Sequence, residues 1–243
     1  MRPRVSVVVT AYNEGEGIVA PLGRILEAVT LPCEVIVVVD DHEDSSIPWI
    51  HKMAEVDPRL RVVVNDLGRG PAFAIRYGIG EALAEVVVVT MADGCDDPTQ
   101  ISALTLLVER GVVIASASRY SRGGQLIGAP LVKGILSRAA GLSLWLFARV
   151  GTRDATNSFK AYSKRFVELV GIESDAGFEV GIELVSKARR YRQPVAEIPT
   201  IWLERVSGES NFKLAQWIPR YVKWYRYAFG PQLRLPATTE SEK

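Results

Sequence analysis

Short runs of mostly β-branched residues recur through the first half of the chain, and segments suited to helices separate them. The runs are Val5–Val9, Val35–Val39, Arg61–Val64, Val86–Val89 and Val112–Ala115. The helix-compatible segments are Gly17–Val29, Ile47–Val56, Pro71–Ala84 and Pro98–Arg110. Most of the runs are apolar on both faces, as expected of parallel strands that are covered by helices. The alternation predicts an α/β fold with a Rossmann-like, mostly parallel sheet flanked by helices.

The pattern changes after Gly124. The expected elements are a long apolar helix, a strand, a helix, a strand and an aromatic, basic helix, at Ala129–Val150, Phe159–Tyr162, Gly177–Tyr191, Val195–Glu204 and Asn211–Phe229. A chain of 243 residues suits one such α/β domain with a terminal extension. We predict a domain over residues 1–213, a basic aromatic helix over 214–235 and a disordered tail over 236–243.

Charge and cysteine content exclude several classes of protein. The net charge of +1 gives no support for nucleic-acid binding. Two cysteines, Cys33 and Cys95, are too few and too far apart for a disulfide framework or a zinc site, which favours a reducing cytosolic setting. No signal peptide is visible, and no segment reaches the about 18 apolar residues typical of a membrane span. The expected protein is soluble or peripheral to a membrane.

Polar or glycine-rich turns follow the predicted strands, at the edge of the sheet where such folds bind ligands. Thr10, Tyr12, Asn13 and Glu14 follow the first strand, where Tyr12 can stack on a base and Asn13 and Glu14 can form hydrogen bonds. Asp40 and Asp41 follow the second, in a position suited to ribose hydroxyls. Arg69, between two glycines after the third strand, can meet a phosphate. Ordinary turns and helix caps are the alternative for each.

Three carboxylates lie close together after the fourth strand. Asp93, Asp96 and Asp97 supply the oxygen ligands that Mg²⁺ or Mn²⁺ prefers when it carries a diphosphate. The alternative is a helix cap before Pro98, which explains Asp97 but leaves Asp93 unexplained.

These segments, in this order, resemble the family 2 glycosyltransferases with a GT-A fold. Later motifs resemble the polyprenyl-phosphate sugar synthases, the subgroup that includes dolichyl-phosphate mannose synthase. Those motifs are Ser118-Arg119-Tyr120, Asp154–Tyr162, Phe178-x4-Glu183, Glu197-Ile198-Pro199 and Arg205–Ser210. The resemblance covers about residues 4–213 and implies an inverting hexosyltransferase that uses a UDP- or GDP-sugar.

The resemblance also implies roles for individual residues. Thr10, Tyr12, Glu14, Asp40 and Asp41 are expected to bind the nucleotide. Asp93, with Asp96 as the replacement oxygen ligand, is expected to hold Mg²⁺ or Mn²⁺. The chain departs from the subgroup at Met91 and Cys95, where relatives place an acidic residue and a glutamine. A thiol suits Mg²⁺ poorly, so Cys95 is not expected to be a ligand.

A polyprenyl phosphate acceptor is anionic and needs cations rather than a base. The resemblance assigns Arg119, Lys133, Ser137 and Arg205 to its phosphate, with Asp93, Arg119 and Arg205 as the catalytic set. Lys133 and Ser137 are four residues apart and share a helical face. A hydroxyl acceptor would instead need a base from Asp154 or the Glu179–Glu183 region. A non-catalytic nucleotide-sugar-binding module is the other alternative.

The basic end of the chain favours a membrane-borne acceptor. From Ser186 to Leu235 there are ten Lys or Arg against three Glu. Aromatic residues recur there at helical spacing, and basic residues lie between them: Trp217, Tyr221, Trp224, Tyr225 and Phe229, with Arg220, Lys223 and Arg226. Such helices lie at the surface of anionic membranes, although packing on the domain would give the same spacing. We expect a peripheral protein on the cytoplasmic face of the cell membrane, with a small integral-membrane partner as its anchor.

Overall fold

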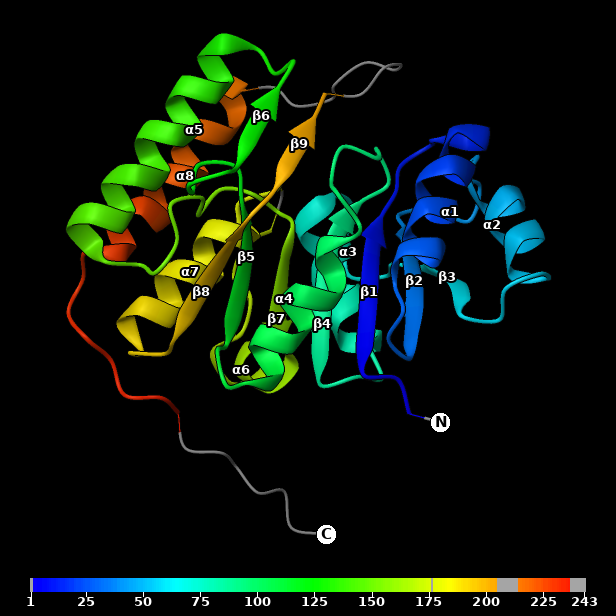
Figure 1. Cartoon of the computed structure of the whole chain (residues 1–243), viewed down its shortest axis with the longest axis horizontal. Coiled ribbons are helices and arrows are strands. Elements are labelled where there is room, and N and C mark those ends of the chain that lie inside the picture. The colour runs from blue at the N-terminus through cyan, green and yellow to red at the C-terminus, as the bar shows by residue number, and fades with distance from the viewer. Residues whose placement is uncertain (1, 176, 205–213, 237–243) are drawn as a thin grey trace, which may run out of the picture.

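The computed structural model describes residues 2–175, 177–204 and 214–236, apart from the side chains of Lys133 and residues 214–217 (Figure 1). Within these residues the main sheet has seven strands in the order β3-β2-β1-β4-β7-β5-β8. They are β1 (Val5–Thr10), β2 (Cys33–Val39), β3 (Leu60–Val64), β4 (Val86–Met91), β5 (Ile114–Ser118), β7 (Lys160–Ser163) and β8 (Val195–Pro199). Only β7 runs antiparallel to its neighbours in this described sheet. The predicted fold class and the first five strands are confirmed.

Helices cover both faces of the sheet, which explains why the strands are apolar on both sides. They are η1 (Gly15–Ile18), α1 (Val19–Ala28), α2 (Ile47–Ala54), α3 (Pro71–Glu81), α4 (Gln100–Glu109), α6 (Lys164–Val170) and α7 (Val180–Arg190). In β1, Val7 and Val9 pack into the core under α1, α2 and α4, whereas Val8 packs under α3 and α7. Alternate side chains of one strand thus serve two cores.

The single strand predicted for Val195–Glu204 is wrong, because the chain changes sheets at Thr200. The strand β8 pairs with β5, whereas β9 (Ile201–Leu203) pairs with β6 (Gln125–Ile127) in a separate two-stranded sheet. Pro199 lacks the N–H needed to continue a ladder. Thr200 joins the two sheets by donating to the Ser118 carbonyl and accepting from the Gln125 N–H.

The long helix predicted after Gly128 is present as α5 (Leu131–Ser143), which continues into one π-helical turn, η2 (Leu144–Ala148). Gly141 lets α5 approach the backbone closely, since a Cβ there would lie 2.1 Å from the Arg153 carbonyl oxygen. The helix therefore packs directly on the segment that leads into Asp154.

The last helix, α8 (Leu214–Ala228), lies beside α5 and α7 (Figure 1). Its Trp224 is 1% exposed and donates from Nε1 to Ser174 Oγ at 3.1 Å. Trp224 therefore packs on the domain and does not face a membrane, which corrects its place in the predicted interfacial set. Of the predicted tail over 236–243, only Pro236 lies within the described residues. Within the described chain, no helix is both long and apolar enough to cross a bilayer.

Candidate functional site

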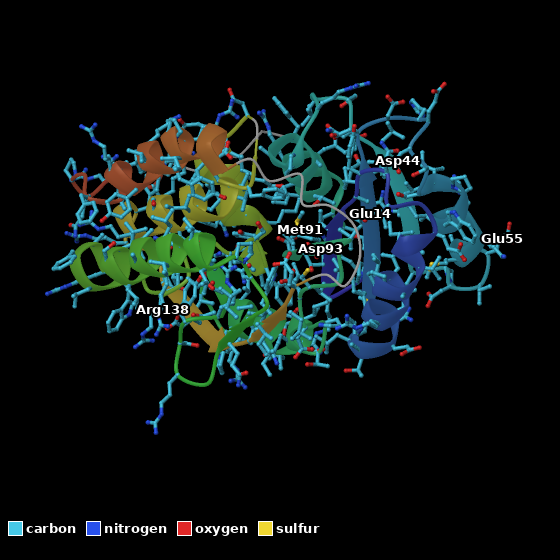
Figure 2. The ribbon with its side chains drawn as sticks, turned by 90° about the horizontal axis from the view of Figure 1, so that it is seen from above. Glu14, Asp44, Glu55, Met91, Asp93 and Arg138 are labelled. Carbon is cyan, nitrogen blue, oxygen red and sulfur yellow. The ribbon has the colours of Figure 1, made fainter. Side chains whose placement is uncertain are left out.

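A cavity of about 820 Å³ opens at the carboxyl edge of the sheet and continues between α5 and α8. Turns after the strands form its polar end, and apolar helix residues form the other. The polar lining includes Thr10, Tyr12, Glu14, Asp40, Arg69, Asp93, Asp96 and Arg119, and the apolar lining includes Leu126, Leu136, Ala140, Ile218 and Val222. Figure 2 shows Glu14, Met91 and Asp93 near one another in the middle of the molecule, away from Arg138. One cavity thus joins a polar and an apolar compartment.

Four of the five residues predicted to bind the nucleotide line this cavity, and Asp41 is not among its lining residues. The Asp40 carboxylate accepts from the Gly70 N–H at 2.7 Å and from Asn65 Nδ2 at 2.9 Å. It therefore fixes the turn that precedes α3. Asp41 pairs instead with Arg69, at 2.8 Å, and Arg69 does line the cavity.

The turn after β1 is held by the turn before α2. Asn13 has a positive φ of 52°, its N–H donates to Asp44 Oδ2, and its Oδ1 accepts from the Ser45 N–H. The hydrogen-bonding capacity expected of Asn13 is therefore used, at Oδ1, in a contact within the protein. Tyr12, beside it, is 58% exposed and lines the cavity, in a position to stack on a base.

Two carboxylates of the loop after β4 face the cavity. Asp93 Oδ1 accepts from the Cys95 N–H at 3.0 Å, and Asp96 Oδ2 accepts from the Thr90 hydroxyl at 2.8 Å. Burial, and then the charge of Asp93, raise the pKa of Asp96 to about 7. Asp97 Oδ1 accepts from the N–H and hydroxyl of Thr99, so Asp97 is engaged in the turn before α4, although the N-cap itself is Thr99 and not Asp97. The loop therefore separates a cavity-facing pair from a structural aspartate.

Met91 and Cys95, the two positions at which the chain differs from the motif of the polyprenyl-phosphate sugar synthases, lie on either side of Asp93 in the sequence. Met91 lines the cavity, and its Sδ accepts from the Thr10 hydroxyl at 3.3 Å. Cys95 is buried, and its carbonyl accepts from the Leu203 N–H. The loop after β4 is thus tied to β1 on one side and to β9 on the other.

The oxygen donors present fit a divalent cation that shares its coordination with a ligand. Within the described residues there is no cluster of three or more His, Cys, Asp or Glu that could hold a metal unaided. Mg²⁺ is usually bound by one or two carboxylates together with water and substrate phosphates. Asp93 and Asp96 supply that number of carboxylates beside space for a diphosphate.

Arg119 lies in the cavity and is held by the buried carboxylate of Asp154. Its Nε and Nη2 lie 2.7 and 2.8 Å from the two oxygens of Asp154, and its backbone N–H also donates to that carboxylate. Burial alone would raise the pKa of Asp154, but the charge and hydrogen bonds of Arg119 outweigh it and lower this pKa. The ion pair fixes the guanidinium in one orientation at the cavity wall.

A second basic side chain, that of Lys160, is buried near this pair. The Lys160 side chain is 0% exposed and donates to the Asn157 carbonyl. Burial lowers its pKa to about 7, although the charge of Asp154 opposes the shift. Sequence reasoning missed the roles of Asp154 and Lys160, because matching a motif does not reveal which side chains pair within it.

Of the other residues predicted to bind the acceptor phosphate, Ser137 lines the cavity and shares a hydrogen bond with the Tyr120 hydroxyl. The Lys133 side chain and all of Arg205 lie outside the described residues.

Thr156, from the segment after Asp154, also lines the cavity. Its buried Oγ1 has no hydrogen-bond partner in the described protein, so it remains available to a ligand.

Comparison with known proteins agrees with this geometry. The model of the family described as glycosyl transferase family 2 matches residues 6–171. An undecaprenyl-phosphate mannosyltransferase from Micrococcus luteus is 29% identical over 86% of this chain and 87% of its own length. A polyprenol monophosphomannose synthase from Mycolicibacterium smegmatis is 28% identical over 88% of this chain and 86% of its own. A dolichol-phosphate mannosyltransferase from Pyrococcus furiosus is 29% identical, and the match spans 64% of its length.

Solved structures support the GT-A fold. A glucosyl-3-phosphoglycerate synthase from Mycobacterium tuberculosis, in complex with Mn²⁺, uridine diphosphate and phosphoglyceric acid, superposes with a TM-score of 0.65 at 18% identity, covering 97% of this chain and 80% of that one. A mannosyltransferase from Pyrobaculum calidifontis, in complex with GDP-Man and Mn²⁺, gives a TM-score of 0.61 at 22% identity. That match covers 93% of this chain and 63% of the other.

Proposed function

The chain belongs to glycosyl transferase family 2, and we propose that it transfers a sugar from a UDP- or GDP-sugar to a polyprenyl phosphate. The observation that carries this proposal is the single cavity with a carboxylate-lined polar end and an apolar end. A nucleotide sugar suits the first compartment, and a lipid-linked phosphate suits the junction with the second. Relatives named for mannosyl transfer to such lipids agree with this assignment.

The donor would lie along the sheet edge. Tyr12 would stack on the base, while Glu14 and Asp40 would face the nucleoside. Asp93 and Asp96 would hold Mg²⁺ or Mn²⁺, which, when bound, offsets the charge that develops on the departing nucleoside diphosphate. These residues leave the sugar directed toward the wall that carries Arg119.

The acceptor phosphate would meet Arg119 at that wall. A phosphate monoester is already anionic at neutral pH, so it needs charge compensation and alignment rather than deprotonation. Arg119 supplies a cation whose orientation is fixed by Asp154, and the Ser137 hydroxyl lies on the same cavity. Lys133 and Arg205 remain predicted members of this set. In-line attack from this side would invert the anomeric centre.

Two of the carboxylates predicted to supply a base for a hydroxyl acceptor, Asp154 and Glu183, are engaged in other contacts. Both oxygens of Asp154 bind Arg119, and both oxygens of Glu183 accept N–H groups, from Glu173 and Ser174. Glu179 is 1% exposed and is absent from the residues that line the cavity. This arrangement favours the phosphate acceptor over the hydroxyl acceptor.

We also propose that the protein lies peripherally on the cytoplasmic face of the cell membrane and that a small integral-membrane protein anchors it there. The support is the nature of the acceptor and the basic character of the chain after Ser186. Tighter membrane binding in the presence of the partner than with lipid alone would support its role. Equal binding to membranes that lack any partner would remove the reason to invoke one.

The test of function is an assay of the purified chain with radiolabelled UDP- and GDP-sugars, Mg²⁺ or Mn²⁺, and polyprenyl phosphate. We expect label in an organic-extractable product that mild acid releases. Label in a water-soluble or polymeric product would favour the hydroxyl acceptor. Tight nucleotide-sugar binding without turnover would show a non-catalytic binding module.

A further inference from the structure

Large apolar side chains are exposed mainly at one end of the molecule. Of eighteen such residues in the described chain, thirteen lie on β6, α5, η2, β9, α8 or the residue after α8. These elements adjoin one another: β6 pairs with β9, Leu126 of β6 packs close to Gly134 of α5, and Ser143 of α5 shares a hydrogen bond with Tyr225 of α8. Figure 1 shows them grouped on the side opposite α1 and α2. We call this exposed set the apolar end.

The centre of the apolar end is one face of α5 and η2. Apolar residues recur along this segment at intervals of four, four, three and four residues, which is the spacing of one helical face. They are Leu131, Ile135, Ala139, Leu142 and Leu146. Leu131 and Ile135 are 80% and 66% exposed, and Phe147 of η2 is 70% exposed. Side chains of this size on one face, without cover, are typical of an interaction surface.

The same segment is strongly basic. Residues 110–153 contain seven Lys or Arg and no Asp or Glu, in a chain whose net charge is only +1. Arg138 of α5 and Arg149, directly after η2, are exposed beside the apolar face. Apolar side chains with basic neighbours favour an anionic lipid surface. A symmetric contact with a second copy would instead bring like charges together.

The apolar end is also continuous with the cavity. Leu136 of α5 and Ile218 and Val222 of α8 are exposed and also line the apolar compartment. A lipid chain that enters between α5 and α8 from a bilayer would pass from one apolar medium to another. Its phosphate would then lie toward Arg119 without the chain crossing water.

We propose that the α5–η2 face, with the exposed apolar residues of α8, β6 and β9, docks on the surface of a bilayer that contains anionic lipids. This inference rests on the proposed function for its biological purpose, but the binding itself does not require catalysis. The occupant is lipid, and docking positions the opening between α5 and α8 at the acyl region.

The test is sedimentation with vesicles of phosphatidylcholine, with and without phosphatidylglycerol, and with no polyprenyl phosphate. The native chain is expected to bind the anionic vesicles more tightly. The double variant Ile135→Glu/Phe147→Glu should bind at least about tenfold more weakly, since it places two charges where apolar side chains enter the interface. The matched control is Val56→Glu, because Val56 is 87% exposed after α2, away from the apolar end, and its variant should bind like the native chain.

A second measurement separates loss of docking from loss of folding or catalysis. With a short-chain acceptor dissolved in detergent, the double variant should keep native turnover, and only its turnover of acceptor embedded in vesicles should fall. Unchanged vesicle binding by the double variant would overturn the docking proposal, and so would native self-association that the same substitutions abolish. Vesicle binding without any sugar transfer would leave docking intact and overturn the proposed function.

Discussion

Replacement of Asp93 by alanine is expected to lower kcat roughly 10³-fold, the scale found when one electrostatic stabiliser of a developing charge is removed. Asp93 faces the cavity beside Asp96, and only one carboxylate of this pair would remain for the cation. Binding of Mn²⁺ in the presence of nucleoside diphosphate, followed by electron paramagnetic resonance, should weaken in parallel.

Asp97→Ala is the matched control, because Asp97 lies in the same loop but accepts hydrogen bonds from Thr99 in the turn before α4. It is expected to cost about 1 kcal/mol of stability while kcat stays at the native value. An Asp93→Ala variant with full activity would refute the role of this carboxylate in metal binding.

Substitution of Asp154 by asparagine is expected to lower the free energy of unfolding by about 3–5 kcal/mol, because it leaves the guanidinium of Arg119 enclosed without its counter-charge. Asp154 is 0% exposed, and the Arg119 side chain is 12% exposed. Urea unfolding measures the loss. The KM for the acceptor should rise as well, since Arg119 is no longer held in one orientation.

A double-mutant cycle separates the ion pair from the packing of its members. Removing both charges, with Arg119→Met and Asp154→Leu together, should cost less than the sum of the single substitutions. Additive costs would show that the two groups do not stabilise each other.

The same pair predicts a pH dependence with a definite sign. Since the folded pKa of Asp154 lies below its unfolded value, its contribution to stability is present above that unfolded value, about 3.9, and is lost as the pH falls through the lower folded pKa. The difference in stability between the native chain and Asp154→Asn should therefore shrink below about pH 4. A difference that stays constant down to pH 2 would contradict the assigned pair.

Local sequence was sufficient to predict the strands and the position of the polar end of the cavity. Val7, Val8 and Val9 show a strand buried on both faces, and the carboxyl ends of parallel strands meet at one edge. For that reason Tyr12, Asp40 and Asp93 were expected together and lie on one cavity. The role of Asn13 could not be predicted in this way. Its Oδ1 accepts from the Ser45 N–H, which is a contact between the turns that follow two different strands.

For the aromatic helix α8, the periodic pattern did not indicate which side chains are buried and which are exposed. The spacing of Tyr221, Trp224 and Tyr225 fits a membrane surface and a packed helix equally well. Packing on α7 buries Trp224, while the exposed apolar surface lies mainly on α5 and η2, a segment that the sequence predicted only as a long apolar helix. Exposure depends on which neighbours cover a face, and no local pattern encodes that.

The sequence by itself determined the alternation of strands and helices and the edge at which Asp93 lies, because both follow from burial and chain direction within short segments. Only the tertiary structure decided that Arg119 pairs with Asp154, that the strand expected at Val195–Glu204 divides between two sheets, and that α5 keeps an apolar face uncovered. Each of these depends on contacts between residues distant along the chain. Such contacts are fixed by strand register and helix packing, which minimise exposed apolar area and unpaired charge over the whole molecule at once.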